Sequence, residues 1–402
     1  MKTLSKSRFV SGVQCEKKLW YSYYRKDLQL PTDEQTQAIF DLGHQIGNLA
    51  QNRFPNGKDA TPEDFSDFSP SIEKTKLWIA EEVETIYEAT FTAKNALCML
   101  DILHRMNDEV WAIEVKNSTS VKDYHLTDAS LQYFVMKEAG YAPDKFFLMH
   151  INNQYIKNGE LTDEFFHLED ITDKVLSKQT WVEENLERLL VMLENKQEPN
   201  VSIGAHCSSP FACDFVHHCW KHIPENSVFE LYRGGNKAWE LYEQGILKIE
   251  DIEDDFPLTH FQHLQRKGLR NQEQYINKEA IKNMISSWQF PLYFFDFETV
   301  FPAIPVLDGT RPYQQVPFQY SLHILEEDGK LSHKEFLAHP EDFSNGKNPL
   351  KLLVEQLKQD FGTDGNIVTY NQSFEVARLN ELANMFPEDA PFLKNLEIGR
   401  AH

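Results

Sequence analysis

The sequence lacks a long apolar run, an excess of positive charge and any closely paired cysteines. No stretch approaches the roughly 20 apolar residues that a membrane-spanning helix needs. The first residues, MKTLSKSRFV, lack the apolar segment of a secretory signal. Hydrophobic residues make up 41% of the 402 residues, enough to form packed cores and to argue against bulk disorder. We therefore expect a soluble cytoplasmic protein of two or three domains with no membrane partner.

The net charge of −22 argues against nucleic-acid binding, because phosphates repel an acidic surface. The charge is uneven, however: residues 1–26 contain seven lysines and arginines and one glutamate, a local charge of +6. Aromatic residues interleave with these charges, a pattern typical of single-strand binding, in which rings stack on bases. An alternative, compatible with the first, is a helix with a solvated basic face and an aromatic core face. The candidate contacts are Lys17, Lys18, Trp20 and Tyr24.

Hydrophobic periodicity divides the chain into three parts. In residues 1–225, helices precede three consecutive strand-like runs (87–93, 96–104 and 109–117), a further helix (123–139) and another strand (145–151), the order of an α/β sandwich. Residues 226–288 look acidic and helical, and a glycine turn within them leaves a helix-hairpin-helix element as an alternative to a plain linker. Residues 289–402 begin a second α/β pattern with the apolar run PLYFFDFETV.

Three helices of the first part are predicted from their patterns alone. One covers residues 7–24. A second covers 33–53 and opens with a capping box from Thr32 to Gln35. A third, long helix covers 173–195.

Two neighbouring strand-like runs of the first part carry charged residues. Asp101 lies in ALCMLDILH, and Glu114 and Lys116 lie in EVWAIEVKN. Because strand side chains alternate, Glu114 and Lys116 share a face, and a short turn lets Asp101 lie beside them. Two carboxylates offer oxygen ligands to Mg²⁺, and the lysine can hold a water or stabilise charge on phosphorus. This set suits phosphodiester hydrolysis; the alternative is an exposed charged strand, because E-x-K is common by chance.

The segment D-I-L…W-A-I-E-V-K…L-Q-Y resembles the RecB-type core of the PD-(D/E)XK nucleases. That core has an aspartate, then E-x-K, then a glutamine on the next helix. The resemblance implies a restriction-endonuclease-like fold and a Mg²⁺- or Mn²⁺-dependent nuclease. The family's tyrosine, four residues after the glutamine, is Met136 here, so only the glutamine is carried over. The implied catalytic residues are Asp101, Glu114, Lys116 and Gln132, with Asp101 and Glu114 as metal ligands.

The same family has a metal-binding histidine in an early helix, after a G-x-x-x pattern. If Gly47 is the glycine of this pattern, the expected histidine position is occupied by Gln51. His44 instead follows Gly43 directly. The resemblance therefore offers His44 as a further metal ligand. The alternative is a surface histidine of an N-terminal helix.

Five cysteines, an odd number, argue against a disulfide framework. One N-terminal cysteine and three after the core resemble the arrangement in AddB and the CRISPR-adaptation exonucleases. In those proteins four thiolates bind a [4Fe–4S] cluster, which implies the ligands Cys15, Cys207, Cys213 and Cys219. The C-terminal spacing is C-x₅-C-x₅-C instead of the usual C-x₂-C-x₅-C. Zinc, which normally uses paired C-x₂₋₄-C knuckles, and unligated thiols are the alternatives; Cys98 is expected in the core.

The third part places two acids in an apolar strand. In Y-F-F-D-F-E-T, Asp296 and Glu298 share one face, and burying them is costly unless they bind metal or pair. The run resembles the first motif of DnaQ-like exonucleases, which have an RNase H-like fold and four acids for two metals. Their second motif, N-x-x-F-D, is Asn371 to Glu375 here, with glutamate replacing aspartate. No third or fourth acid motif is found, so we expect a truncated, incomplete metal site, with a degenerate nuclease fold as the alternative.

Together these features are similar to a bacterial group that joins a RecB-like nuclease with cysteines to a DnaQ-like domain. The resemblance implies a DNA nuclease with a structural iron–sulfur cluster. The expected form is an exonuclease that acts on single strands or ends. Two other functions stay open. One is a catalytically inactive nucleic-acid- or partner-binding protein that keeps the fold, and the other is a zinc-stapled scaffold.

Overall fold

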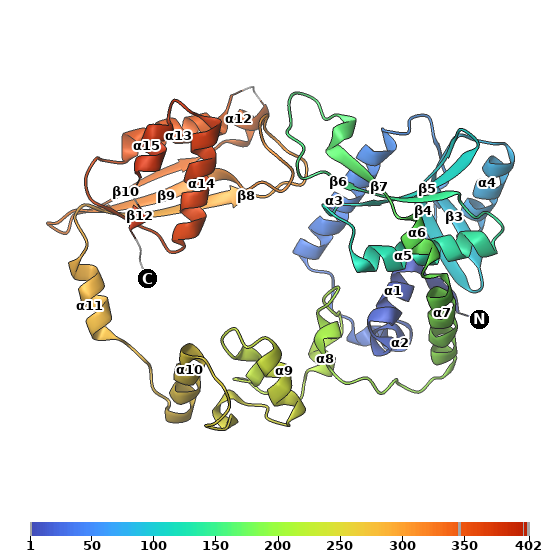
Figure 1. Ribbon diagram of the computed structural model, residues 1–402, viewed down its shortest axis with the longest axis horizontal. Helices are drawn as coiled ribbons and strands as arrows, with labels where there is room; N and C mark the ends of the chain where they lie inside the picture. The colour runs from blue at the N-terminus through green and yellow to red at the C-terminus, as the bar shows by residue number, and fades with distance from the viewer. Residues whose placement is uncertain (1, 345–346, 397, 400–402) are drawn as a thin grey trace. The chain divides into compact units, whose positions relative to one another are not determined.

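The computed structural model describes residues 2–344, 347–396 and 398–399, and it contains two mixed α/β units (Figure 1). The first unit comprises Met1–Ile151 and Phe166–Tyr275, and the second comprises Asn152–Phe165 and Ile276–His402. The expected α/β class is therefore observed. The boundary falls within the segment expected as a linker, and the excursion at 152–165 was not expected. Among the described helices, none combines the length and apolar character needed to span a membrane.

The first unit is built on a seven-stranded sheet. Its order is β2-β3-β4-β5-β6-β7, and β1 pairs with β4. Strands β3, β4 and β5 form an antiparallel meander, β6 is parallel to β5, and β7 is antiparallel to β6. The strands are β1 (Leu4–Ser5), β2 (Lys58–Asp59), β3 (Thr85–Ala93), β4 (Ala96–Met106), β5 (Glu109–Lys116), β6 (Lys145–Ile151) and β7 (Phe166–Asp170).

Two-residue turns join the strands of the meander. Lys94 and Asn95 connect β3 to β4, and Asn107 and Asp108 connect β4 to β5. All four have positive φ angles, between 49° and 67°. Two successive residues with positive φ match the right-handed twist of the flanking strands, which sets the hairpin register.

Seven helices surround this sheet in the described chain before residue 200. They are α1 (Lys6–Gln14), α2 (Glu16–Tyr24), α3 (Glu34–Gln51), α4 (Ser69–Ala80), α5 (Asp123–Glu138), α6 (Thr172–Leu176) and α7 (Gln179–Glu194). Helix α5 makes the crossover from β5 to β6, and Leu131 and Val135 on it are fully buried in the main core. The buried face of α7, including Leu186 and Leu189, contributes to the same core.

Three details of the helix predictions were wrong. The helix expected over 7–24 is interrupted at Cys15, whose backbone is extended at φ −162° and ψ 117°. The helix expected over 173–195 is two helices, α6 and α7. Helix α3 is capped by Asp33, whose carboxylate accepts a 2.7 Å hydrogen bond from the Thr36 amide, and not by Thr32.

Residues after the cysteine-rich segment form a small core of their own. It contains Val228, Leu231, Leu241, Ile249 and Ile252. The helical elements here are α8 (Val216–Cys219), α9 (Asn236–Glu243), α10 (His260–Asn271) and the short turns η4 (Val228–Glu230) and η5 (Ile249–Asp251). The region expected as a helical linker is therefore partly helical and locally packed.

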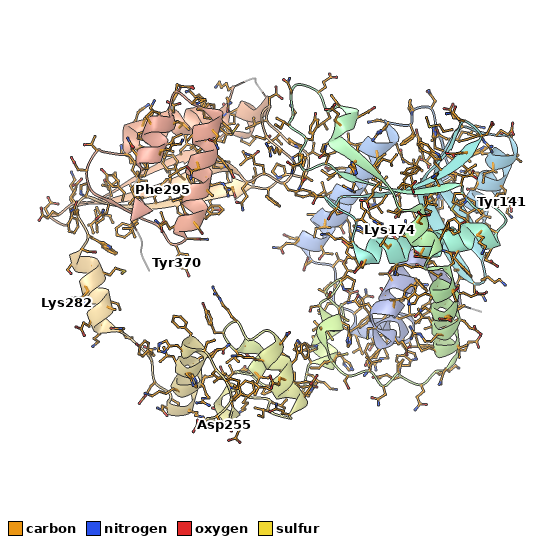
Figure 2. All side chains as sticks on the ribbon, viewed as in Figure 1. Tyr141, Lys174, Asp255, Lys282, Phe295 and Tyr370 are labelled. Carbon is orange, nitrogen blue, oxygen red and sulfur yellow. The ribbon has the colours of Figure 1, made fainter. Side chains whose placement is uncertain are left out.

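The second unit contains a five-stranded sheet in the order β10-β9-β8-β11-β12. Its strands are β8 (Leu292–Val300), β9 (Val316–Leu325), β10 (Leu331–Leu337), β11 (Asn366–Val368) and β12 (Ile398–Gly399). Its helices are α11 (Lys278–Ser286), α12 (Pro340–Ser344), α13 (Pro349–Asp360), α14 (Gln372–Met385) and α15 (Ala390–Asn395). Phe295 of β8, labelled in Figure 2, lies in the core together with Tyr293 and Phe297 of the same strand and with Leu353 and Leu357 of α13.

The excursion 152–165 packs within the second unit through backbone pairing. The Lys157 amide donates to the Thr310 carbonyl at 3.0 Å, and the Gly309 amide donates to the Lys157 carbonyl at 2.8 Å. The Lys157 ammonium group also lies 2.7 Å from an Asp308 carboxylate oxygen. A segment that begins and ends on the first sheet is thereby part of the second unit.

Candidate active site

The charged residues of β4 and β5 meet where the ladder between these strands ends. The last backbone pair of the ladder is Ile102 with Ile113. One residue further, the Asp101 carboxylate accepts a 2.6 Å hydrogen bond from the Val115 amide. Asp101 therefore satisfies an amide beyond the end of the ladder and is held beside β5.

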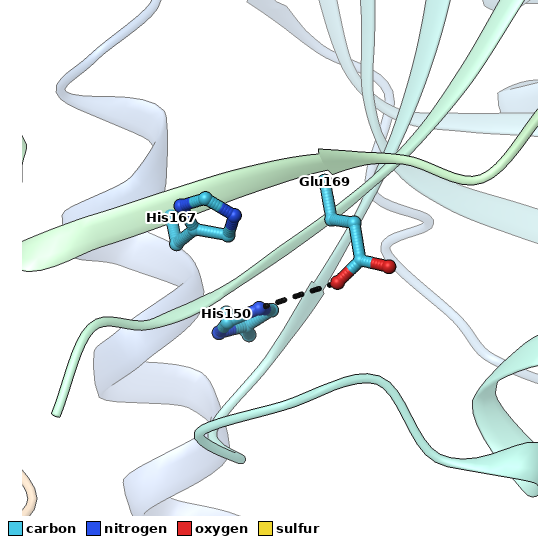
Figure 3. A group of neighbouring side chains, drawn as sticks. All are labelled: His150, His167 and Glu169. Carbon is cyan, nitrogen blue, oxygen red and sulfur yellow. Dashed lines mark ion pairs between the residues drawn. The ribbon is translucent and has the colours of Figure 1, made fainter.

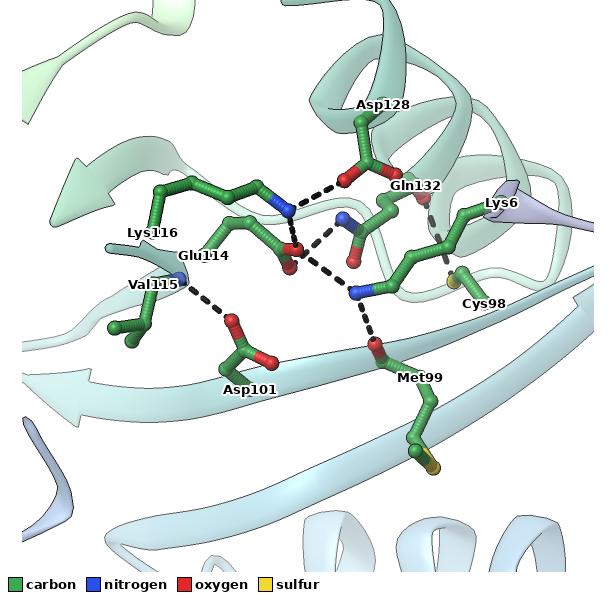
Figure 4. A network of polar contacts seen from close by, with 9 residues as sticks. All are labelled: Lys6, Cys98, Met99, Asp101, Glu114, Val115, Lys116, Asp128 and Gln132. Atoms are coloured by element: carbon green, nitrogen blue, oxygen red, sulfur yellow. Dashed lines mark hydrogen bonds and ion pairs between the residues drawn. The ribbon is translucent and has the colours of Figure 1, made fainter. Parts of the chain in front are cut away.

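Glu114 is the most enclosed member of this group, with 1% of its surface exposed. Its Oε1 accepts hydrogen bonds from Lys116 Nζ at 2.6 Å and Lys6 Nζ at 2.8 Å, and its Oε2 accepts one from Gln132 Nε2 at 2.8 Å (Figure 4). Burial alone would raise the pKa of Glu114, but the two ammonium groups and their hydrogen bonds hold that pKa well below its usual range. Glu114 is therefore a carboxylate at neutral pH.

Lys116 bridges two acids. Its Nζ lies 2.8 Å from Asp128 Oδ2 in addition to its contact with Glu114. Burial would lower the pKa of Lys116, but Asp128 and Glu114 raise it above its usual value. The lysine is thus charged, and its ammonium group is held between the sheet and α5.

Two members of this network were missed by sequence reasoning. Asp128 precedes Gln132 by four residues on α5, so the two share a helix face, and that spacing was an available signal. Lys6 lies at the start of α1, more than a hundred residues before Glu114, and its Nζ also donates to the Met99 carbonyl at 3.1 Å. No local pattern predicts a contact over that separation.

Glu88 on β3 is a third residue that the sequence did not reveal. The β3–β4 ladder pairs Tyr87 with Ile102 and Ala89 with Leu100, and it skips Glu88 and Asp101, which lie between. Glu88 has a φ of 53°, a left-handed conformation that costs about 1–3 kcal/mol in a non-glycine residue and often marks a functional site. Burial and the negative charge of Asp101 raise the pKa of Glu88 to about 8.

Lys6, Asp101, Glu114, Lys116 and Asp128 line a cleft of about 830 Å³. Its walls come from α1, α3, β4, β5, α5 and the segment around Phe211. His44 is exposed on α3 and lines this cleft together with Asp101, Glu114 and Lys116. The structure therefore brings Asp101, Glu114, Lys116 and His44 to one concave surface, whereas Gln132 is fully buried and reaches the site only through its hydrogen bond to Glu114.

Crowded carboxylates make the stability of the metal-free protein depend on pH. Burial and the Glu114 charge raise the pKa of Asp101 from 3.8 to about 6. Between these values the folded chain binds more protons than the unfolded chain, so this group reduces stability as the pH rises from about 4 to 6. Without divalent metal, Asp101→Asn should therefore be more stable than wild type above pH 6 and should lose this advantage below pH 4.

Urea-unfolding midpoints across this pH range would test that expectation. Glu109→Gln, at an exposed position on the same sheet, is the matched control and should show no such crossover. If the urea midpoint of Asp101→Asn equals that of wild type at every pH, the raised pKa assigned to Asp101 is contradicted.

The four cysteines expected as ligands line one enclosed cavity between the start of α2 and the segment 201–219. Cys213 donates its amide to the Cys207 carbonyl at 3.0 Å, which folds this segment around the cavity. Burial raises the pKa of the Cys213 thiol to about 11, and the neighbouring Cys15 and Cys207 add to this effect. Cys98 is fully buried in the main core, where the sequence predicted it.

The residues expected to contact nucleic acid are engaged inside the protein. Trp20 is 8% exposed and packs with Tyr21 and Phe215. The Tyr24 hydroxyl donates to the Leu193 carbonyl at 2.6 Å. The ammonium group of Lys17 lies 3.3 Å from Glu198, and that of buried Lys18 donates to Gln14 at 3.1 Å. Trp20 therefore belongs to an aromatic core face, which was the alternative stated from the sequence.

The second unit holds a smaller acidic group. Asp296 and Glu298 lie on β8, where both are exposed, so neither carries the cost of burial that was considered for an apolar strand. Glu375 on α14 is 1% exposed, and its Oε2 has no hydrogen-bond partner among the described residues. Burial and the nearby Asp296 raise the pKa of Glu375. The helix thus brings Glu375 to Asp296 from another element.

Comparisons with known proteins concern mainly parts of the chain. Residues 293–398 match a family described as "Domain of unknown function (DUF2779)". "Uncharacterized protein MG366" of Mycoplasma genitalium is 30% identical over 99 residues, or 24% of this chain and 14% of that protein. "Uncharacterized protein UU173" of Ureaplasma parvum is 31% identical over 125 residues, or 30% and 17%. The matched segments thus span less than a fifth of these relatives.

One solved structure, described as "Crystal structure of SSO0001", aligns with 55% of this chain and 86% of that chain. The sequence identity is 15% and the TM-score is 0.29. A score this low establishes no shared fold.

Proposed function

We propose that residues 1–225 form a DNA nuclease of the PD-(D/E)XK type that depends on Mg²⁺ or Mn²⁺. The observation that carries the proposal is the convergence of Asp101, Glu114 and Lys116 on one open cleft. Two acids and a lysine from adjacent strands supply the groups that phosphodiester hydrolysis requires. DNA, as single strands or ends, is the proposed substrate.

The donor set fits a hard divalent cation. Asp101 and Glu114 would hold the ion, with His44 of the same cleft and Glu88, which lies opposite Asp101 in the β3–β4 register, as further donors. The raised pKa values of Asp101 and Glu88 support this assignment, because burial and the neighbouring carboxylates disfavour their charged forms and a bound cation would favour them. A bound ion would supply Lewis-acid activation of water and would neutralise charge on the phosphate.

The remaining residues of the site orient the metal-binding carboxylate and stabilise charge. Lys116, charged and fixed by Glu114 and Asp128, directs an ammonium group into the cleft, where it can orient water or stabilise negative charge on phosphorus. Gln132 donates to Glu114 and so fixes the orientation of that carboxylate. Lys6 neutralises part of the buried charge of Glu114, which keeps an unpaired charge from destabilising the fold.

For the four cysteines we propose a structural [4Fe–4S] cluster. A tetrahedral zinc ion with Zn–S bonds of about 2.3 Å brings its sulfurs to about 3.8 Å of one another. Among the described residues, no three of these sulfurs lie within 4.8 Å of one another. A four-iron cluster is a larger body whose thiolate ligands lie further apart, so this spacing favours it over zinc.

For residues 289–402 we propose a DnaQ-like, RNase H-like fold without cleavage activity of its own. Asp296, Glu298 and Glu375 supply fewer acids than a two-metal site of that family uses. The buried, unpartnered oxygen of Glu375 beside Asp296 supports a remnant of such a site.

A cleavage assay tests the main proposal. Full-length protein with Mn²⁺ and an end-labelled single strand should shorten the strand, and removal of metal with EDTA should abolish the reaction. Retention of the strand without any cleavage, in Mn²⁺ or Mg²⁺, would favour the alternative of an inactive nucleic-acid-binding protein.

A further inference from the structure

We propose that His150, His167 and Glu169 bind a divalent transition-metal ion at the β6–β7 edge of the first sheet (Figure 3). One ligand atom from each residue lies within 4.8 Å of the other two. Two imidazoles and a carboxylate are donors that zinc and other first-row ions prefer. This site uses no residue of the proposed nuclease centre or of the cysteine cavity, and it does not depend on either proposal.

The strand pairing presents all three side chains on one surface. His150 on β6 and His167 on β7 are direct partners in the antiparallel register, and their ring centroids are 5.1 Å apart. Glu169 lies two residues after His167, so it projects from the same face of β7. Regular sheet structure therefore preorganises the ligands, and no loop has to become ordered on binding.

The hydrogen bond of His150 fixes which ring nitrogen faces the cluster. Its Nδ1 lies 3.1 Å from the Ile151 carbonyl oxygen, which can only accept, so Nδ1 carries the proton. In the neutral ring, Nε2 then offers a lone pair, and it lies 3.9 Å from Glu169 Oε2. Metal-binding histidines commonly donate their other N–H to a backbone carbonyl in this way.

A metal ion would bridge His150 Nε2 and Glu169 Oε2, the two atoms that lie opposite each other. His150 is 6% exposed, so a lone pair opposite a carboxylate oxygen has little water to separate the two. With metal–ligand bonds of about 2.0–2.1 Å, a tetrahedral site places ligand atoms about 3.4 Å apart. The 3.9 Å separation of these two atoms needs to contract by about 0.5 Å, within the range of small side-chain rotations.

The surroundings orient the carboxylate and leave one coordination position open. Glu169 Oε1 accepts a 2.9 Å hydrogen bond from the Lys174 ammonium group, which leaves Oε2 for the metal. His167 is exposed at the sheet edge, so the ion would contact solvent. Three protein ligands with an open fourth position are typical of zinc sites that take water or an oxyanion.

Titration of the metal-depleted, full-length protein with Co²⁺, followed by visible absorption and calorimetry, tests this site. His167→Ala, at an exposed position, should lose the d–d bands of one nitrogen- and oxygen-bound Co²⁺ and weaken its binding by at least about tenfold to a hundredfold. Glu169→Gln, which keeps the side-chain shape, should weaken the same event. His260→Ala, also exposed, is the matched control and should bind as wild type does.

The spectra separate this site from the others. Co²⁺ bound by cysteines gives sulfur-to-metal charge-transfer bands in the near ultraviolet, and these should persist in His167→Ala. Circular dichroism would verify that both variants are folded. Identical Co²⁺ spectra and affinities in wild type, His167→Ala and Glu169→Gln would overturn the inference and leave a simple His150–Glu169 ion pair.

Discussion

Lys116→Ala is expected to lower the rate of DNA cleavage by about 10²–10⁴-fold, the usual contribution of a positioned acid–base group. The ammonium group of Lys116 contacts Glu114 and Asp128 beside the cleft, and the substitution removes it. Glu114 would keep its hydrogen bonds to Lys6 and Gln132, so we expect the fold to survive. The initial rate of release of end label in Mn²⁺ measures the effect.

Two variants serve as controls for that experiment. Lys145→Ala removes a half-exposed lysine at the start of the neighbouring strand β6 and should leave the rate nearly unchanged. Asp296→Ala, in the second unit, should also leave it nearly unchanged if that unit does not cleave. Wild-type rates in Lys116→Ala would refute the assignment of the active site, and a large loss in Asp296→Ala would move the chemistry to the second unit.

Cys15→Ala is expected to remove the iron from the protein and to destabilise the first unit strongly. Cys15 lies at the break between α1 and α2, and the other three cysteines lie nearly two hundred residues later. Joining the ends of so long a loop restricts the unfolded chain by about 5 kcal/mol in the entropy model used for disulfides. Anaerobically purified wild type should be brown and lose its colour in air, whereas the variant should be colourless.

Cys98→Ala is the matched control, because Cys98 is a buried cysteine outside the cavity. It should retain the iron and lose only a small amount of packing energy, on the order of 1 kcal/mol. Iron and zinc contents per chain decide between the two metals. A colourless wild-type protein that holds one zinc and no iron would refute the iron–sulfur cluster. Zinc would then be the metal that closes the loop.

Local patterns predicted the elements that carry the first candidate site. Strand β6 was predicted residue for residue, and β4, β5 and α5 to within two residues, because their apolar runs and turn signals are unambiguous. The alternation of I-E-V-K placed Glu114 and Lys116 on one face, and the structure adds the contact with Asp101 through the Val115 amide. Short-range periodicity is sufficient to predict the strand and the face on which such residues lie.

The rest of the site depends on contacts that periodicity cannot encode. Lys6 reaches Glu114 only because β1 pairs with β4 and thereby places the start of α1 over the sheet. Glu88 depends on one left-handed backbone angle inside an ordinary strand sequence. His150 and His167 become neighbours through the pairing of β7, a strand that the pattern of the chain did not predict.

The excursion at 152–165 also determines an order of events during synthesis. Residues 152–165 leave the ribosome more than a hundred residues before residues 308–310, with which Lys157 pairs. At about 5–20 residues per second, their partners emerge on the order of 10 s later. In that interval the Lys157 backbone and ammonium group have not yet met their partners at Asp308, Gly309 and Thr310. The nascent first unit therefore carries a segment that is not yet paired, and the loop between β8 and β9 completes it only when that loop emerges.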